Sequence, residues 1–169
     1  TPMTDAEGGK CNLSILENFF NEASSVDTKA VFIIKSTIPV GTTERMSKLY
    51  PHMKIVHNPE FLTAANAEQD FLNADRHVIG GDLELVSEIE TLYETAFPNI
   101  PVYTMESKES ECVKYFANCF LATKVMLFNE MKMLCNNLSG VDFERILQGV
   151  CSDVRIGNSH TLVPGPDGD

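Results

Sequence analysis

Ser107 to Leu138 reads SKESECVKYFANCFLATKVMLFNEMKMLCNNL and belongs to the longest segment of this 169-residue chain without glycine or proline. We expect a single helix here, because Ser107 can cap its start, acidic residues occupy its first turn and Gly140 can end it. The middle of this helix, residues 115–128, is apolar on nearly every side. Protein should therefore cover both of its faces, as two layers of one fold or as two subunits.

Two polar residues, Lys114 and Asn118, fall one turn apart on one face of the expected helix. In one explanation they lie on a solvated stripe together with Glu111, which is the commoner situation for an isolated pair of this kind. In the other they are held inside the protein for a chemical purpose. The helix alone leaves both explanations open.

Upstream of this helix, short apolar runs alternate with segments of helical spacing. The pattern predicts strands at 30–34, 54–56, 76–81 and 101–104, and helices at 13–23, 43–49, 64–72 and 83–96. This alternation is typical of an α/β fold with a doubly wound parallel sheet. Beyond the long helix, a short helix is expected at 143–150 and a loop from Asp153 onward. We divide the chain into domains 1–105 and 106–169, where the α/β pattern gives way to helices.

Composition excludes several classes of function. The formal net charge is −11 and basic residues are not clustered, which argues against nucleic acid as a partner. The sequence shows neither a membrane-spanning segment nor a signal peptide, so the expected location is the cytoplasm and no membrane partner is expected. Five cysteines and four histidines lack the spacing of metal ligands, and no metal site is predicted.

Candidate functional residues follow two of the predicted strands. Open α/β sheets bind ligands beyond the carboxyl ends of their strands. Ser36 and Thr37 come directly after the strand at 30–34, and Glu60 follows the strand at 54–56. Each motif also has an ordinary explanation, because Ser-Thr-x-Pro and Asn-Pro-Glu are common turn sequences.

Four motifs, taken together, resemble one family. They are STIPVGT at 36–42, NPEFL at 58–62, ECVKYFANCFLATKVMLFNE at 111–130 and DVRIG at 153–157. In this order and spacing they are similar to the nucleotide-sugar dehydrogenases of the UDP-glucose and GDP-mannose dehydrogenase family. The resemblance covers nearly the whole chain but only the middle of the family's architecture. The sequence contains neither the upstream GxGxxG turn that holds the dinucleotide pyrophosphate nor the downstream Gly-Gly-x-Cys segment with its nucleophilic thiol.

The resemblance implies an architecture. Residues 1–105 would form the C-terminal part of a Rossmann-like NAD-binding domain. Residues 106–169 would supply the long central helix and a truncated helical dimerisation domain, with a homodimer formed through the 107–138 helix.

The resemblance also implies a reaction, the four-electron oxidation of a sugar C6 alcohol to a carboxylate with two NAD, through a thioester on the family's cysteine. Ser36 and Thr37 would lie at the nicotinamide end of NAD, and Thr37 would help to position water. Glu60 would act as general base or proton relay in hydrolysis. Lys114 and Asn118 would stabilise oxyanion charge near C6.

For the substrate, the resemblance implies that the backbone of Phe61, Leu62, Thr63 and Ala64 holds the sugar nucleotide. Many family members carry glutamate at position 64 or 65, where this chain has alanine. Arg155 would reach across the dimer towards the sugar nucleotide, since a guanidinium offers donors in a fixed fork. The alternative for Arg155 is an exposed pair with Asp153.

The turn IGNSH at 156–160, followed by VPGPDG, is nearer to the UDP-glucose branch of the family. We therefore expect oxidation of UDP-glucose to UDP-glucuronate by the full-length parent, and no activity from this chain alone. Two alternatives remain. One is a β-hydroxyacid or 6-phosphogluconate type of dehydrogenase that uses Lys114 as its acid/base, and the other is a non-catalytic dimerisation module.

Overall fold

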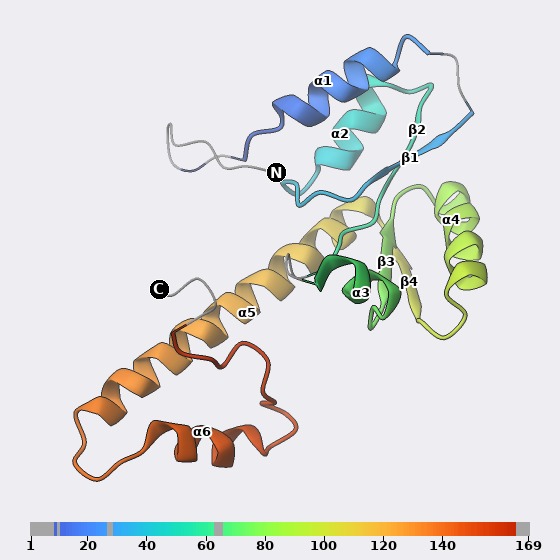
Figure 1. Cartoon of the computed structure of the whole chain (residues 1–169). Helices are drawn as coiled ribbons and strands as arrows, with labels where there is room; N and C mark the ends of the chain where they lie inside the picture. Colours follow the sequence, from blue (N-terminus) through green and yellow to red (C-terminus); the bar gives the residue numbers. More distant parts are fainter. Residues whose placement is uncertain (1–8, 10, 27–28, 63–65, 165–169) are drawn as a thin grey trace. The chain divides into compact units, whose positions relative to one another are not determined.

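The structure is a computed structural model that describes residues 9, 11–26, 29–62 and 66–164 (Figure 1). The chain divides into two compact units between Tyr115 and Phe116, inside the long helix. The domain division expected between residues 105 and 106 stays a prediction.

The first unit contains a sheet of four short strands. These are β1 (Val31–Ile34), β2 (Lys54–His57), β3 (His77–Gly80) and β4 (Val102–Met105), in that spatial order. β1 is parallel to β2, and β3 is parallel to β4. All four strands lie where the sequence predicts them, within one or two residues at their ends.

One pairing differs from the predicted parallel sheet. β2 and β3 are antiparallel and share the residue pair His57 and Gly80. The helix that precedes β3, α3 (Ala67–Leu72), has six residues and spans about 9 Å, less than the roughly 13 Å of a four-residue strand. A parallel pair would need a crossover that returns the chain to the edge where β2 began, and this short helix is not a full crossover helix.

Three further helices of this unit confirm the predicted ones. They are α1 (Ser14–Ala23), α2 (Thr42–Leu49) and α4 (Leu83–Ala96). Polar side chains mark two of the starts: the Asn12 side-chain amide oxygen accepts the Ser14 N–H at 3.0 Å, and the Asp82 carboxylate accepts the Glu84 N–H at 3.1 Å. The helix predicted at 64–72 corresponds to α3, and residues 64 and 65 lie outside the described part of the chain.

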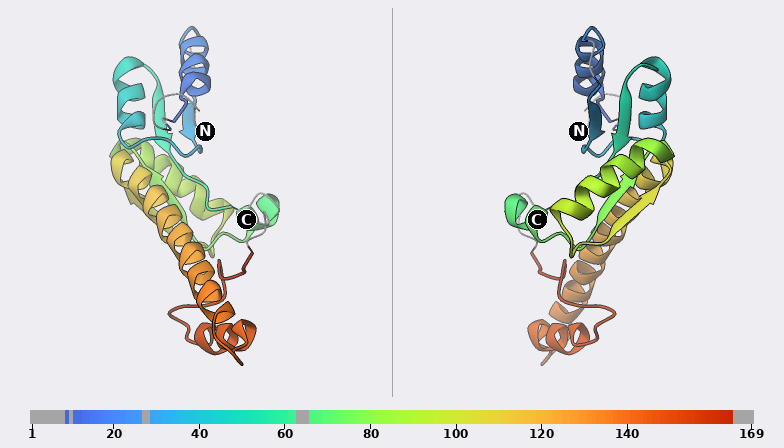
Figure 2. Two further views of the ribbon diagram at one scale, coloured as in Figure 1. Left: turned by 90° about the vertical axis from the view of Figure 1, so that its left-hand side faces the viewer. Right: turned by 90° about the vertical axis from the view of Figure 1, so that its right-hand side faces the viewer.

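The strands carry apolar side chains on both faces of the sheet. Ile34 packs with Phe20 of α1 and Met46 of α2, whereas Ile33 packs against the cluster that contains Val86 of α4. Figures 1 and 2 show α1 and α2 beside β1 and β2, and α4 along β3 and β4. Helices therefore cover both faces, which confirms the doubly wound α/β class.

The long helix, α5 (Ser107–Asn136), is present almost as predicted. It begins at Ser107, so the preceding residue Glu106 holds the cap position that the sequence analysis gave to Ser107. The Glu106 N–H donates to the side chain of Glu109 at 2.9 Å. Gly140, with a φ of +75°, lies in the turn that follows the helix.

The second unit combines α5 from Phe116 onward with α6 (Phe143–Cys151) and the loop that follows it. Phe128, Phe143 and Cys151 form its buried apolar cluster. Two lysines of α5 hold the loop: Lys124 donates to the Ile156 carbonyl at 2.7 Å and Lys132 to the Val163 carbonyl at 2.6 Å. No helix among the described residues has the length and apolar character needed to cross a membrane.

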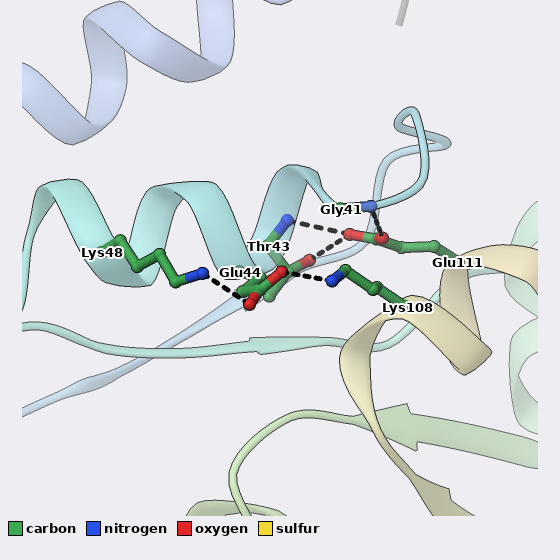
Figure 3. A network of polar contacts seen from close by, with 6 residues as sticks. All are labelled: Gly41, Thr43, Glu44, Lys48, Lys108 and Glu111. Carbon is green, nitrogen blue, oxygen red and sulfur yellow. Dashed lines mark hydrogen bonds and ion pairs between the residues drawn. The ribbon is translucent and has the colours of Figure 1, made fainter.

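A buried carboxylate joins the start of α5 to α2 (Figure 3). The Glu111 side chain is fully buried. One carboxylate oxygen accepts the Thr43 N–H at 2.8 Å and the Thr43 hydroxyl at 2.7 Å, and the other accepts the Gly41 N–H. The two N–H donors, those of the cap residue Gly41 and of Thr43, are free groups at the positive end of α2, where an anion is favoured.

The residue before Glu111 packs against the sheet. A Cβ added to Gly80 in β3 would come within 2.1 Å of the Ser110 Oγ and 2.9 Å of the Glu106 carbonyl oxygen. Position 80 therefore accepts only glycine while Ser110 and the backbone of α5 stay in place. The first turn of α5 is thus fixed both by the sheet and by α2.

We predict that Glu111→Gln destabilises the chain by about 2–3 kcal/mol, because an amide group would face N–H donors that now bind a carboxylate. Urea unfolding followed by circular dichroism measures the change.

Glu44→Gln is the matched control. Glu44 pairs with Lys108 and Lys48 at the surface beside Glu111, and hydrogen bonds from these lysines lower the pKa of its carboxyl to about 2. Exposed pairs of this kind contribute little to stability. Equal shifts for the two variants would contradict the role given to Glu111.

Candidate functional site

Five of the residues proposed from the sequence come together. Ser36 and Thr37 follow β1, Glu60 and Leu62 follow β2, and Lys114 projects from α5. With Lys35 they line one hollow of about 310 Å³, which we call the Lys114 hollow. It lies at the carboxyl ends of two parallel strands, the place where open α/β sheets bind ligands.

Lys114 is half-buried at this hollow. Its ammonium donates to the backbone carbonyl of Glu60 and lies 5.2 Å from the centre of the Phe61 ring. Burial lowers the pKa of Lys114, the Glu60 charge opposes that shift and Arg76 adds to it. The solvated stripe considered for Lys114, Asn118 and Glu111 is therefore wrong for Glu111, which is fully buried, whereas Lys114 is half-buried against the 58–62 loop and Asn118 is exposed.

An amide that the sequence analysis did not single out connects the two loops. Asn58 is 1% exposed. Its side-chain oxygen accepts the Lys35 ammonium at 2.9 Å and the Tyr93 hydroxyl at 2.6 Å, and its NH₂ donates to the Val78 carbonyl at 2.7 Å. We call these four residues the Asn58 cluster.

A second hollow of about 220 Å³ adjoins the first and shares Lys35, Glu60 and Leu62 with it. Arg76 lines this hollow, with its guanidinium carbon 4.3 Å from the centre of the Phe61 ring. The ring of Phe61 therefore contacts two cations, Arg76 and Lys114. The only sequence signal for Arg76 was its place at the start of a predicted strand.

Of the other residues proposed from the sequence, Phe61 lines the adjoining hollow, and the rest belong to the second unit or lie outside the described residues. Asn118 is exposed on α5 and belongs to the second unit, as does Arg155. The Arg155 guanidinium pairs with the Asp153 carboxylate at 2.5 Å, which is the alternative that the sequence left open. Thr63 and Ala64 lie outside the described residues. In the part of the chain that the structure describes, no three His, Cys, Asp or Glu side chains are grouped as metal ligands would be.

Two buried histidines lie near the site. His57 is fully buried, and its Nδ1 is 2.7 Å from the Ser110 Oγ. His77 is 5% exposed and packs on Tyr93, with ring centres 4.6 Å apart. Burial lowers the pKa of both imidazoles, although the Glu111 charge opposes the shift at His57.

The free energy of unfolding should fall as the pH drops from 7.5 to 5.5. Unfolded imidazoles, with a pKa near 6.5, bind protons in this window, and the folded ones, whose pKa is lowered by burial, bind fewer. Urea midpoints at the two pH values measure this. His77→Phe should reduce the dependence of stability on pH, because it removes one of the two imidazoles. Phenylalanine suits this position because its neighbours Phe71, Tyr93 and Phe97 are aromatic. Equal midpoints for the unmodified chain at both pH values would refute the expectation.

Sequence comparison gives the same family for both parts of the chain. Residues 1–97 match the model of the UDP-glucose/GDP-mannose dehydrogenase family, NAD binding domain. Residues 108–168 match the model of the same family's central domain.

Individual relatives are moderately similar and considerably longer. UDP-glucose 6-dehydrogenase YwqF of Bacillus subtilis is 34% identical over 144 residues, which cover 80% of this chain and 32% of that protein. A UDP-glucose 6-dehydrogenase of Pseudomonas aeruginosa is 35% identical over 172 residues, covering 94% and 38%. The solved UDP-glucose dehydrogenase of the hyperthermophilic archaeon Pyrobaculum islandicum is 33% identical with a TM-score of 0.81, covering 95% of this chain and 39% of that one.

This chain therefore spans between about a third and two fifths of the length of these relatives. The matches extend over both units and include the motifs at 36–42, 58–62, 111–130 and 153–157. The chain belongs to the UDP-glucose/GDP-mannose dehydrogenase family, with residues 1–97 in its NAD binding domain and residues 108–168 in its central domain.

Proposed function

We propose that this chain is part of an enzyme that oxidises UDP-glucose to UDP-glucuronate with NAD, and that it contributes the Lys114 hollow to the active site. The observation that carries the proposal is the convergence of Thr37, Glu60 and Lys114 on this one hollow. Relatives named UDP-glucose 6-dehydrogenases support it. Glu60 favours it over the β-hydroxyacid alternative, which needs only the Lys114 and Asn118 pair.

The residues present fit one end of NAD, the cofactor that accepts hydride when bound. Ser36 and Thr37 line the hollow beyond β1, and their hydroxyls can hydrogen-bond the nicotinamide end. No GxGxxG turn for the pyrophosphate occurs in this sequence. The contact with NAD proposed for this chain is that of Ser36 and Thr37 with the nicotinamide end.

In the proposed site, Lys114 acts on the oxygen at C6. A partly desolvated ammonium held by the Glu60 carbonyl is a preorganised donor to an oxygen that gains negative charge. Asn118, one turn further along the helix, would donate to the same oxygen.

Glu60 would accept a proton from water during hydrolysis, with Thr37 positioning that water. The backbone of Phe61, Leu62, Thr63 and Ala64 would hold the sugar nucleotide. Arg155 would bind the charged part of the sugar nucleotide held by the other subunit of a dimer. Its ion pair with Asp153 would have to break first.

In the full-length parent, Lys114→Ala should lower kcat by about 100-fold or more while KM for UDP-glucose changes only a few-fold. The charge of Lys114 is used on the oxyanion rather than on the ground state. Steady-state NADH formation measures both constants.

Lys108→Ala provides the control, because Lys108 lies in the same helix but pairs with Glu44 at the surface.

The isolated 169-residue chain, which lacks the Gly-Gly-x-Cys thiol, should form no NADH. An unchanged kcat for Lys114→Ala would remove the basis of the proposal. A parent that oxidised a β-hydroxyacid instead of UDP-glucose would favour the alternative.

The proposal includes a homodimer formed through α5. Its second-unit portion exposes large apolar side chains: Phe116 is 72% exposed, Phe120 69%, Met126 60% and Leu134 61%. Beside them lies an apolar hollow of about 250 Å³ between α5 and the loop after α6. Exposed apolar side chains of this size on one helix are typical of an interface between subunits. All five cysteines are free, which suits the reducing cytoplasm as the proposed location.

Light scattering at micromolar concentration should therefore show a dimer. Phe120→Glu should give a monomer, since a charge would enter the apolar interface. Leu83→Glu, at a position 79% exposed on α4, should leave the dimer intact. A monomeric unmodified chain would contradict this part of the proposal.

A further inference from the structure

The two loops that carry the proposed catalytic residues are joined by one side chain. Lys35 immediately precedes Ser36 and Thr37, and Asn58 stands two residues before Glu60. The Asn58 amide oxygen binds Lys35, and the Asn58 backbone N–H donates to the Ile34 carbonyl at 2.9 Å. Beyond the paired ends of β1 and β2, the Asn58 side chain therefore ties the two loops together.

The Asn58 amide is held from other directions as well. Tyr93, 8% exposed on α4, donates its hydroxyl to the same oxygen at 2.6 Å, and the Val78 carbonyl of β3 accepts the amide NH₂ at 2.7 Å. Both lone pairs of the oxygen are thus in use. A buried polar group with its bonds satisfied on several sides has little freedom to rotate or shift.

Lys35 brings charge into this arrangement. Its ammonium lines the Lys114 hollow and lies 5.5 Å from the centre of the Phe71 ring. Burial lowers the pKa of Lys35, and the Glu60 charge opposes part of this shift. Without the Asn58 oxygen, this half-buried ammonium would lose an acceptor and move towards the Glu60 side of the hollow.

We infer that Asn58 is a positioning residue for Glu60 and Lys114, and that Tyr93 and Lys35 hold it in place. Asn58 fixes the start of the 58–62 loop. That loop presents the Glu60 carbonyl, which in turn receives the Lys114 ammonium. Tyr93 thus acts on the reaction from α4 without lining either hollow at the site. This inference rests on the proposed function.

The test uses Tyr93→Phe in the full-length parent. The change removes one hydroxyl and keeps the ring that packs on His77 and Phe97. We expect kcat to fall about 3- to 10-fold, the equivalent of one hydrogen bond, with KM for UDP-glucose and NAD changed less than about twofold. Asn58→Ala, a more drastic change of the same amide, can fail to fold, so Tyr93→Phe is the variant that decides.

Ile89→Val is the matched control. Ile89 lies on α4 in the same apolar cluster as Tyr93 and is 6% exposed. Its truncation should cost a similar amount of stability, judged by thermal unfolding, and leave kcat unchanged. An equal loss of kcat in Ile89→Val would show that Tyr93 acts only through stability and would overturn the inference.

A double-mutant cycle with Lys114→Ala supplies a second measurement. If Tyr93 acts through the position of Lys114, Tyr93→Phe should lower kcat less in the Lys114→Ala background than in the unmodified enzyme. Unchanged kcat in Tyr93→Phe, or a fully additive cycle, would overturn the inference. Failure of the proposed function is distinguishable, because there Lys114→Ala itself would leave kcat unchanged.

Discussion

The arrangement of the first unit depends on the buried Glu111 carboxylate, which is bound at the N-terminus of α2. Among the described residues, Glu111 has no cationic hydrogen-bond partner. Its donors are two backbone N–H groups and one hydroxyl at the start of α2. The partial charge of the helix N-terminus compensates for burial of the anion. Because Lys114 follows Glu111 by one turn, fixing Glu111 also fixes the direction in which Lys114 leaves α5.

Local sequence signals identified the elements well. The β-branched run at Ala30–Ile34, the helical spacing of apolar residues at 83–96 and the length of the 107–138 segment each describe a property of neighbouring residues, and each led to a strand or helix that the structure contains. The antiparallel step between β2 and β3 was missed because strand direction depends on the path of the crossover, which residue type does not encode. The first turn of α5 was misread by one position, because serine is a preferred cap residue and glutamate is not.

The candidate site was predictable only in part. Ser36, Thr37 and Glu60 could be found because they follow strands, and Lys114 because it interrupts an apolar helix. Glu111, Asn58 and Tyr93 could not be assigned contacts, because their partners lie far away in the sequence. Residue type does not distinguish a polar side chain that is buried and fully hydrogen-bonded from one that is exposed to solvent. Burial is therefore the information that the sequence lacks.

The close approach of Gly80 to Ser110 also limits how this protein can change over time. A methyl group at position 80 would overlap the serine side chain and also crowd a backbone carbonyl. Shortening residue 110 to glycine would therefore relieve only part of the conflict. The two sites therefore differ in what they tolerate: residue 110 can become smaller while Gly80 remains, but Gly80 cannot become larger, before or after that change, without moving the start of the helix that carries the site.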